Sequence, residues 1–237
     1  MEKQTSNSKK SSGFNKFLLL WAGELISSIG GGLTSFGLGV YVFRQTGSAA
    51  SMALVSLLAF LPTLLLSAPA GVLADKYDRR LLMMLGDGLS GLGIVYILVC
   101  MLTGEAKLYQ ICIGVFISSV FSSLLEPSYR ATVSDVLTKE EFSRANGMVS
   151  IAGSARYLIS PIIAGGLLAV SDIKVLLVID ICTFIITVIT TGVVKKGIVA
   201  KYETKSEGFI DSFKEGLKAV TERKGILYLI IVSSVMT

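Results

Sequence analysis

The sequence has no histidine and only three cysteines, so the usual metal-binding and haem-binding side chains are nearly absent. Cys100, Cys112 and Cys182 each lie inside a long apolar run, and their spacing matches no zinc or haem pattern. We expect them to pack as small apolar side chains rather than to form disulfides. The sequence therefore predicts no metal site and no cofactor.

Charge is also scarce in this chain. Only 16% of its 237 residues are charged and 52% are hydrophobic, whereas soluble domains carry about 25% charged residues. A soluble protein with a very apolar core would show polar residues at helical spacing, and the longest runs do not. Several of these runs reach the roughly 20 residues that a helix needs to cross a bilayer. We therefore expect an all-α, multi-pass protein embedded in the lipid bilayer.

The features of an enzyme are missing as well. We find no nucleophile beside a base and no phosphate-binding glycine loop between a strand and a helix. The glycine clusters lie inside the apolar runs instead. The net charge of +5 is confined mostly to loops between apolar runs, which indicates membrane orientation rather than nucleic-acid binding. We expect a protein that is not an enzyme and binds no nucleic acid.

The apolar runs predict six membrane spans and the start of a seventh. The spans cover approximately residues 17–43, 48–74, 81–103, 107–128, 146–170 and 174–194. A polar tail over 1–16 precedes them, a polar and basic loop over 195–225 follows, and the apolar stretch over 226–237 is too short to cross. In the loop, apolar residues at helical spacing favour an amphipathic helix on the inner membrane surface, although a partly ordered linker is the alternative.

The distribution of basic residues predicts the orientation. Only Arg44, Lys107 and Lys174 fall on one side of the membrane, and Arg156 lies within a span. All other lysines and arginines fall on the side of the N-terminus. Because basic loops stay inside, we expect the N-terminus in the cytoplasm of a cell-membrane protein. The first span is long and rich in glycine, so we expect it to be retained rather than cleaved as a signal peptide.

The turn over residues 71–80 is dense in charge and lies between two long apolar runs. It has the order Gly71, any residue, leucine, a small residue, Asp75, a basic residue, two further residues, Arg79 and Arg80. Gly71 would let two helix ends approach closely, and Asp75 could cap a helix or pair with one of the arginines. This order resembles the signature loop of the major facilitator superfamily, although Asp78 stands where the family prefers glycine. The plainer alternative is a basic loop that only anchors the inner face.

Other segments resemble the same family. Glu126 and Pro127, followed by Ala131, are similar to the inner end of its fourth helix. Gly153, Pro161 and Gly165 are similar to its helix-five antiporter motif, with Ser160 in place of the usual glycine. Residues 144–147 and 214–217 resemble segments of drug-efflux and macrolide-efflux members, respectively.

The resemblance implies the N-terminal half of a secondary transporter, built as two three-helix inverted repeats. The full-length activity would be export of a small amphiphilic or drug-like substrate such as a macrolide, coupled to protons by alternating access. Its partner would be a second six-helix half. The alternative is a truncated or half-length protein that binds or assembles but does not transport alone.

Five ionisable residues fall within the expected spans, and each is costly if it faces lipid. Glu24 and Arg156 lie near the midplane, followed by Asp180, and we expect these three to bind the substrate or couple protons. A structural ion pair of Arg156 with one of the carboxylates is the alternative. The remaining two are expected in a gating cluster at the inner face, which comprises Gly71, Asp75, Arg79, Arg80, Asp87, Glu126 and Arg130.

Overall fold

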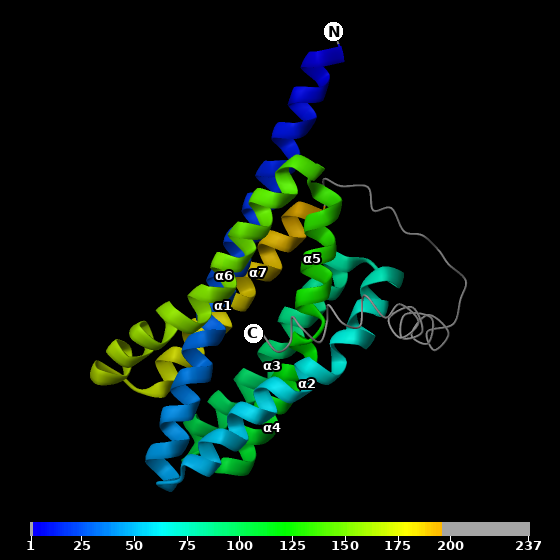
Figure 1. The fold of residues 1–237 in the computed structure, drawn as a ribbon. Coiled ribbons are helices and arrows are strands. Elements are labelled where there is room, and N and C mark those ends of the chain that lie inside the picture. The colour runs from blue at the N-terminus through cyan, green and yellow to red at the C-terminus, as the bar shows by residue number, and fades with distance from the viewer. Residues whose placement is uncertain (1, 196–237) are drawn as a thin grey trace, which may run out of the picture.

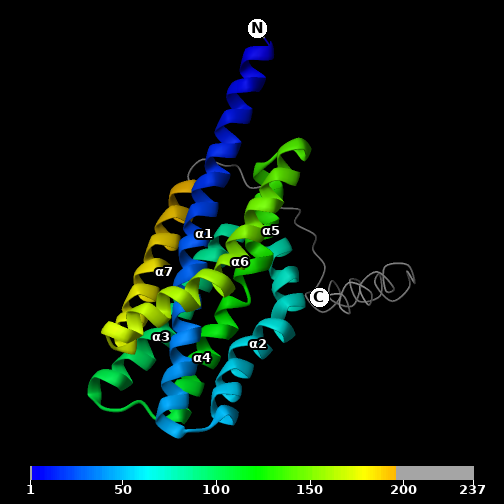
Figure 2. The same cartoon turned by 60° about the vertical axis from the view of Figure 1, so that its left-hand side comes forward.

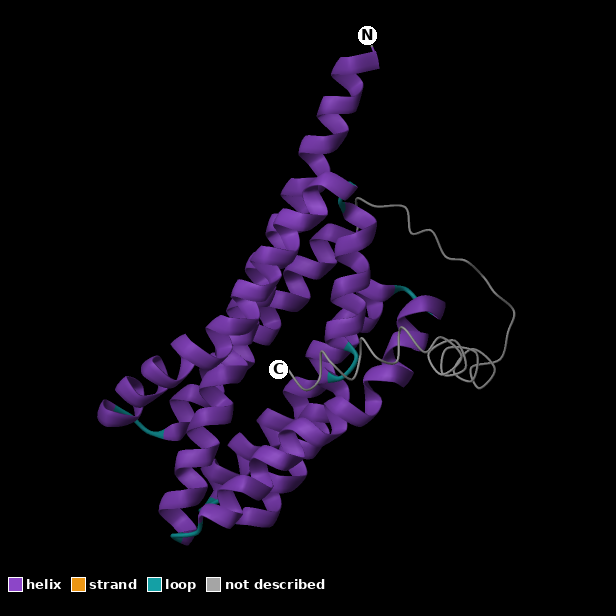
Figure 3. Ribbon diagram, viewed as in Figure 1, coloured by secondary structure: helices purple, strands orange, loops and turns teal. Residues whose placement is uncertain are grey.

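The computed structural model describes residues 2–195, and every element in that part of the chain is helical (Figures 1 and 3). The helices are α1 (Glu2–Thr46), α2 (Ala49–Lys76), α3 (Arg79–Thr103), α4 (Leu108–Ser122), α5 (Leu125–Val136), α6 (Lys139–Val170) and α7 (Ile173–Lys195).

Six helical segments are long and apolar enough to span a membrane, which confirms the number predicted from the sequence. They are Gly13–Thr46, Ala49–Lys76, Arg79–Thr103, Leu108–Val136, Glu141–Val170 and Ile173–Val194. The expected loop over 195–225, apart from Lys195, and the expected seventh helix over 226–237 lie outside the described residues.

Two helices extend further than the apolar pattern predicts. The N-terminal tail continues α1 as one helix from Glu2. The fifth spanning helix begins at Lys139, well before the predicted 146. A capping box explains this start: the Thr138 backbone N–H donates to Glu141 Oε2 at 3.1 Å, and the Thr138 side chain receives the reciprocal bond. The Thr-x-x-Glu spacing was visible in the sequence, but the polar residues around it concealed the helix.

The fourth predicted span is two helices joined by a break at Ser123 and Leu124. Pro127 explains the break, because proline has no N–H to donate to the carbonyl of Ser123 and its ring crowds that carbonyl. At the break, the Leu124 N–H donates to the carbonyl of Phe121, three residues before it, at 3.1 Å, which is the tighter 3₁₀ pattern. The chain then continues as α5, so the whole span reaches Val136.

Helix α1 lies between α6 and α7 and packs extensively against both (Figures 1 and 2). Glycines make this approach possible. A Cβ atom on Gly32 would lie 2.8 Å from the main-chain oxygen of Arg156, and one on Gly30 would lie 2.9 Å from Asp180 Oδ1. Small residues at such contacts let helix backbones come close together in a membrane.

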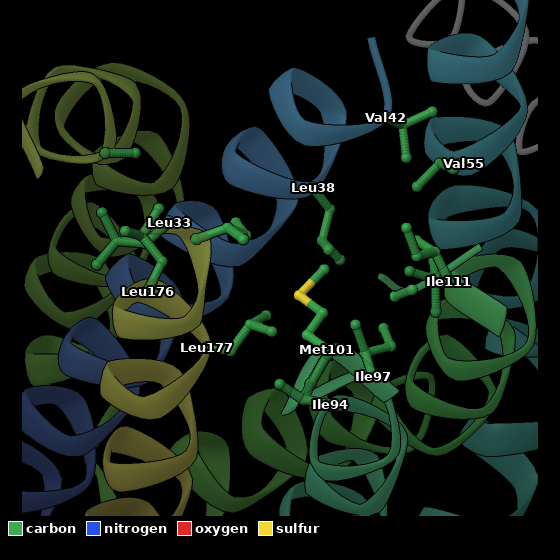
Figure 4. Close-up of a cluster of buried hydrophobic side chains, with 14 residues drawn as sticks. Leu33, Leu38, Val42, Val55, Ile94, Ile97, Met101, Ile111, Leu176 and Leu177 are labelled. Atoms are coloured by element: carbon green, nitrogen blue, oxygen red, sulfur yellow. The ribbon is translucent and has the colours of Figure 1, made fainter. Parts of the chain in front are cut away.

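Two apolar cores hold the bundle together. The larger core lies at the end away from the 71–80 loop and joins all the spanning helices (Figure 4); its labelled members include Leu38, Ile97, Ile111 and Leu177. The smaller core lies at the end that carries the 71–80 loop and is formed by Phe17, Leu20, Met83, Tyr129, Val133, Ala145 and Val194. We call them the far core and the loop-side core.

Helices α2 and α6 bury little of their surface within the described part of the chain. The share of buried residues in their most apolar windows is 11% and 22%, against 50% for α1. Phe60 and Leu65 on α2, and Tyr157 and Ile162 on α6, are more than half exposed. Two long apolar faces are therefore available to lipid or to another protein segment.

Candidate functional site

A layer of polar side chains lies between the far core and the loop-side core. Helices α1, α3, α6 and α7 all contribute to it. We define this polar layer by Glu24, Ser27, Thr34, Asp87, Ser90, Arg156, Ser160, Asp180, Thr183 and Thr187. Because polar groups in the middle of a membrane bundle are costly, this layer is the first candidate for a functional site.

Glu24 lies on α1 and is only partly satisfied. Its Oε1 atom accepts a long hydrogen bond of 3.5 Å from the Ser28 hydroxyl, four residues along the same helix. Its Oε2 atom is buried and has no hydrogen-bond partner in the described part of the chain. The positive charge of Arg156 acts on it from α6.

Asp180 lies on α7 and is 1% exposed. The Thr183 hydroxyl donates to the Asp180 main-chain carbonyl at 2.7 Å and lies 3.5 Å from its Oδ1 atom. Arg156 again provides the nearby positive charge. Glu24 and Asp180, which we grouped from the sequence, thus share one arginine.

Arg156 itself is exposed on α6. Its Nη2 atom donates to the Ser35 hydroxyl of α1 at 3.4 Å. No carboxylate among the described residues lies within ion-pair distance of it. The structural ion pair considered above is therefore not formed, and the guanidinium remains accessible from the exposed side of α6.

Asp87 belongs to this layer and not to the loop cluster in which the sequence placed it. It is 0% exposed, and both of its carboxylate oxygens lack a hydrogen-bond partner in the described part of the chain. The like charges of Glu24 and Asp180 act on it. Eight residues of helix, about 12 Å, separate Asp87 from Arg79.

The 71–80 loop forms a second charged region, centred on Arg79. Its Nη1 atom donates to Asp135 Oδ2 at 2.6 Å and to the Ala131 carbonyl at 3.2 Å. Its Nη2 atom lies 3.6 Å from Asp75 Oδ1. Asp75 therefore pairs with Arg79, which is one of the two roles expected for Asp75. Asp135 on α5 is the partner that sequence reasoning missed, because nothing in its own segment marks it. Arg79 thereby ties α3 to the end of α5.

Asp78, the departure from the family pattern, caps α3. Its Oδ1 atom accepts from the backbone N–H groups of Arg80 at 3.0 Å and Leu81 at 3.4 Å. An aspartate here satisfies two N–H groups that the first helical turn leaves open. The capping role expected of Asp75 thus belongs to Asp78.

Several other predicted site residues are members of neither region. Glu126 and Arg130 pair with each other at 2.8 Å on the exposed side of α5, and the charge of Glu126 acts on Glu24 of the polar layer. A Cβ atom on Gly71, Gly153 or Gly165 would meet nothing within 4 Å in the described part of the chain. The close approach expected at Gly71 is therefore not present.

Of the helix-five motif, the segment at Pro161 makes the closest packing contact. The Ser160 hydroxyl donates to the Ile29 carbonyl of α1 at 3.1 Å, and Gly32 leaves room for it. The serine that replaces the family's usual glycine thus joins α6 to α1 beside Arg156. Arg80, from the loop motif, is buried at 5% exposed.

Six apolar helices around a layer of polar and charged side chains define a multi-pass membrane protein. The comparison of sequences names the family. A family model described as "transmembrane secretion effector", a branch of the major facilitator superfamily, matches residues 13–236. The chain belongs to this family.

Relatives in two organisms are named as macrolide efflux proteins. The chain is 26% identical over 220 residues to macrolide efflux protein A of Streptococcus pyogenes, covering 92% of this chain and 54% of that protein. It is 25% identical over 189 residues to macrolide efflux protein A of Enterococcus faecalis, covering 79% of this chain and 58% of the relative. The chain thus spans about half the length of these relatives.

Solved structures share the fold. A bacterial homologue of the iron transporter ferroportin, in its outward-facing state, superposes with a TM-score of 0.64 at 18% identity, over 80% of this chain and 52% of that one. A peptide transporter superposes with a TM-score of 0.64 at 12% identity, over 93% of this chain and 46% of that one. At these identities the likeness shows the fold alone.

Proposed function

We propose that this chain forms the N-terminal half of a secondary transporter that exports a drug-like, amphiphilic compound such as a macrolide in exchange for protons. The polar layer is the observation that carries the proposal. It places Glu24, Arg156 and Asp180 between two apolar cores, and Arg156 is accessible from the exposed side of α6. The relatives of this chain that are named as macrolide efflux proteins supply the substrate class.

The exposed apolar faces of α2 and α6 fit a second six-helix half. The chain covers 54% of one relative's length, which leaves room for such a half in the full-length protein. Tyr157 is 75% exposed and lies next to Arg156 on α6. A substrate between the halves would meet an aromatic ring and a guanidinium together, which suits an amphiphile with an apolar body and polar groups.

The 71–80 loop supplies a gate. Arg79 joins Asp75, at the end of α2, and Asp135, at the end of α5, so the ends of three helices are held together. With the N-terminus in the cytoplasm, this clamp closes the inner side and its release opens that side. Alternating access requires such a contact to be made in one state and broken in another. Arg80 belongs to the same turn and is buried.

The test uses the full-length protein in sealed vesicles with an imposed proton gradient. We expect the gradient to drive accumulation of a labelled macrolide, and collapse of the gradient by a protonophore to stop it. Empty vesicles are the control. If no drug-like compound from a panel moves in response to the gradient, the proposed export is wrong.

A further inference from the structure

Asp87 is the acidic residue of the polar layer whose carboxylate has no hydrogen-bond partner in the described part of the chain. Glu24 has the Ser28 hydroxyl and the charge of Arg156 near it, and Asp180 has Thr183 and the same arginine. Asp87 has neither a hydrogen-bond donor nor a described basic side chain acting on it. Even Ser90, one turn along α3, donates to the Asp87 main-chain carbonyl at 2.9 Å and not to the carboxylate.

The other helices packed against α3 bring no positive charge to this site. Helix α7, which packs against α3, contributes Asp180, and Glu24 acts from α1, which does not pack closely against α3 in the described part of the chain; both are acidic. On α5 the Tyr129 hydroxyl is buried without a hydrogen-bond partner in the described part of the chain, and the charged Glu126 and Arg130 pair with each other. Helix α4 carries no charged residue, and its Cys112 packs at the far core. On α2 the charged residues lie at the loop end.

Burying an unpaired charge beside two like charges is strongly unfavourable. Arg156 acts on Glu24 and Asp180, so the third carboxylate, Asp87, has no compensating positive charge among the described residues. A metal ion could compensate them, but no group of three acidic or thiol side chains in the described residues is arranged to hold one. A proton needs only one carboxyl group, and a neutral carboxylic acid at Asp87 removes the conflict.

We infer that Asp87, buried on α3 where this helix packs against α7, binds the coupling proton. This assignment rests on the proposed function and deepens it. The sequence pointed to Glu24, whereas the structure points to its unpartnered neighbour. Loss of the proton adds one negative charge on α3 to those of Glu24 on α1 and Asp180 on α7, and so favours movement of α3 away from them.

Helix α3 connects this site to the gate. The helix begins at Arg79, which holds Asp135, and reaches Asp87 about two turns later. A displacement of α3 caused by charge at Asp87 would therefore act directly on the Arg79–Asp135 contact. Protonation and gating are joined through one continuous helix, without any further element.

Infrared difference spectroscopy tests the assignment without any substrate. The sample is the full-length protein in vesicles, and the signal is the carbonyl band of a protonated carboxylic acid that disappears at alkaline pH. We expect wild type to show this band, Asp87→Asn to lose it, and Glu24→Gln and Asp180→Asn to keep it. Glu105→Gln, an exposed carboxylate in an outer loop, is the matched control and keeps it.

Asp87→Glu guards against a folding defect, because it should restore the band at a shifted frequency together with proton-driven transport. A band that survives in Asp87→Asn, is absent from wild type, or disappears only in Glu24→Gln would overturn the inference. Transport that follows a sodium gradient and ignores the proton gradient would overturn it too. Vesicles that move no compound but lose the band in Asp87→Asn would instead count against the proposed export and leave the proton site standing.

Discussion

The 71–80 loop and the polar layer both place charges at helix contacts, but they satisfy those charges differently. In the loop, Arg79 has a carboxylate partner at 2.6 Å and a second one at 3.6 Å. In the layer, one arginine acts on two of the three acidic residues, and it forms no ion pair in the described part of the chain. Charges that form an ion pair stabilise one arrangement of helices. Buried polar groups without a hydrogen-bond partner are unfavourable, and a proton or ligand that binds reversibly would supply that partner. Under the proposed function, the loop would hold the helices together and the layer would bind the substrate and the proton.

The largest expected effect comes from removing the arginine of the layer. Arg156→Ala leaves Glu24 and Asp180 without their shared positive charge and removes the exposed guanidinium. We expect gradient-driven transport to fall by about a hundredfold or more, because a buried unpaired charge costs about 3–5 kcal/mol. Transport in vesicles measures the effect. Arg156→Lys, which keeps the charge, should retain part of the activity, and equal loss in both variants would argue against a role for charge.

A glycine substitution tests whether close packing builds the layer. Gly32→Ala forces a methyl group against Ser160 and the Arg156 main chain. We expect destabilisation by about 1–3 kcal/mol, as for other overpacked sites. Thermal unfolding in detergent is the measurement, and Gly88→Ala on α3 is the matched control, since a Cβ atom there meets nothing within 4 Å. Equal shifts in the two variants would contradict the packing argument.

A double-mutant cycle measures the holding role of the loop. Arg79→Ala and Asp135→Asn each remove one side of the 2.6 Å contact. We expect a coupling energy of about 1 kcal/mol, because the pair is partly exposed to solvent. Thermal unfolding of the two single variants and the double variant gives the value. Additive effects would show that the contact does not hold α3 to α5.

The smallest effect is expected at the ion pair that lies outside both regions. Glu126 and Arg130 are an i,i+4 pair on α5, with side chains 65% and 62% exposed. Glu126→Gln should cost no more than about 0.5 kcal/mol. Salt should weaken this small effect further, since exposed charges are screened. A loss as large as that of Arg79→Ala would place Glu126 in the gate after all.

Much of the fold follows from local sequence patterns. Long apolar runs predict the spans, because a membrane helix needs a fixed length of apolar residues. The helix boundaries that differ from the predicted ones depend on single residues. The capping box at Thr138 starts α6 early, and Pro127 breaks the fourth span. These effects concern a few hydrogen bonds and leave the apolar pattern almost unchanged.

The site was harder to predict, because its grouping depends on which helices become neighbours. Glu24, Arg156 and Asp180 were identified by their depth in the expected spans. The sequence grouped Asp87 with the nearby loop charges, whereas the carboxylates that act on it in the structure, Glu24 and Asp180, come from other helices. Asp135 was missed because only the folding of α5 against α3 brings it to Arg79.

Equilibrium binding separates the two regions most directly. The measurement compares the affinity of a labelled macrolide for purified full-length wild type, Arg156→Ala and Arg79→Ala. If the layer binds and the loop holds, Arg156→Ala should weaken binding by about tenfold or more, which corresponds to about 1.4 kcal/mol, while Arg79→Ala keeps nearly normal affinity but loses transport. Normal binding in Arg156→Ala together with lost binding in Arg79→Ala would contradict this division of roles.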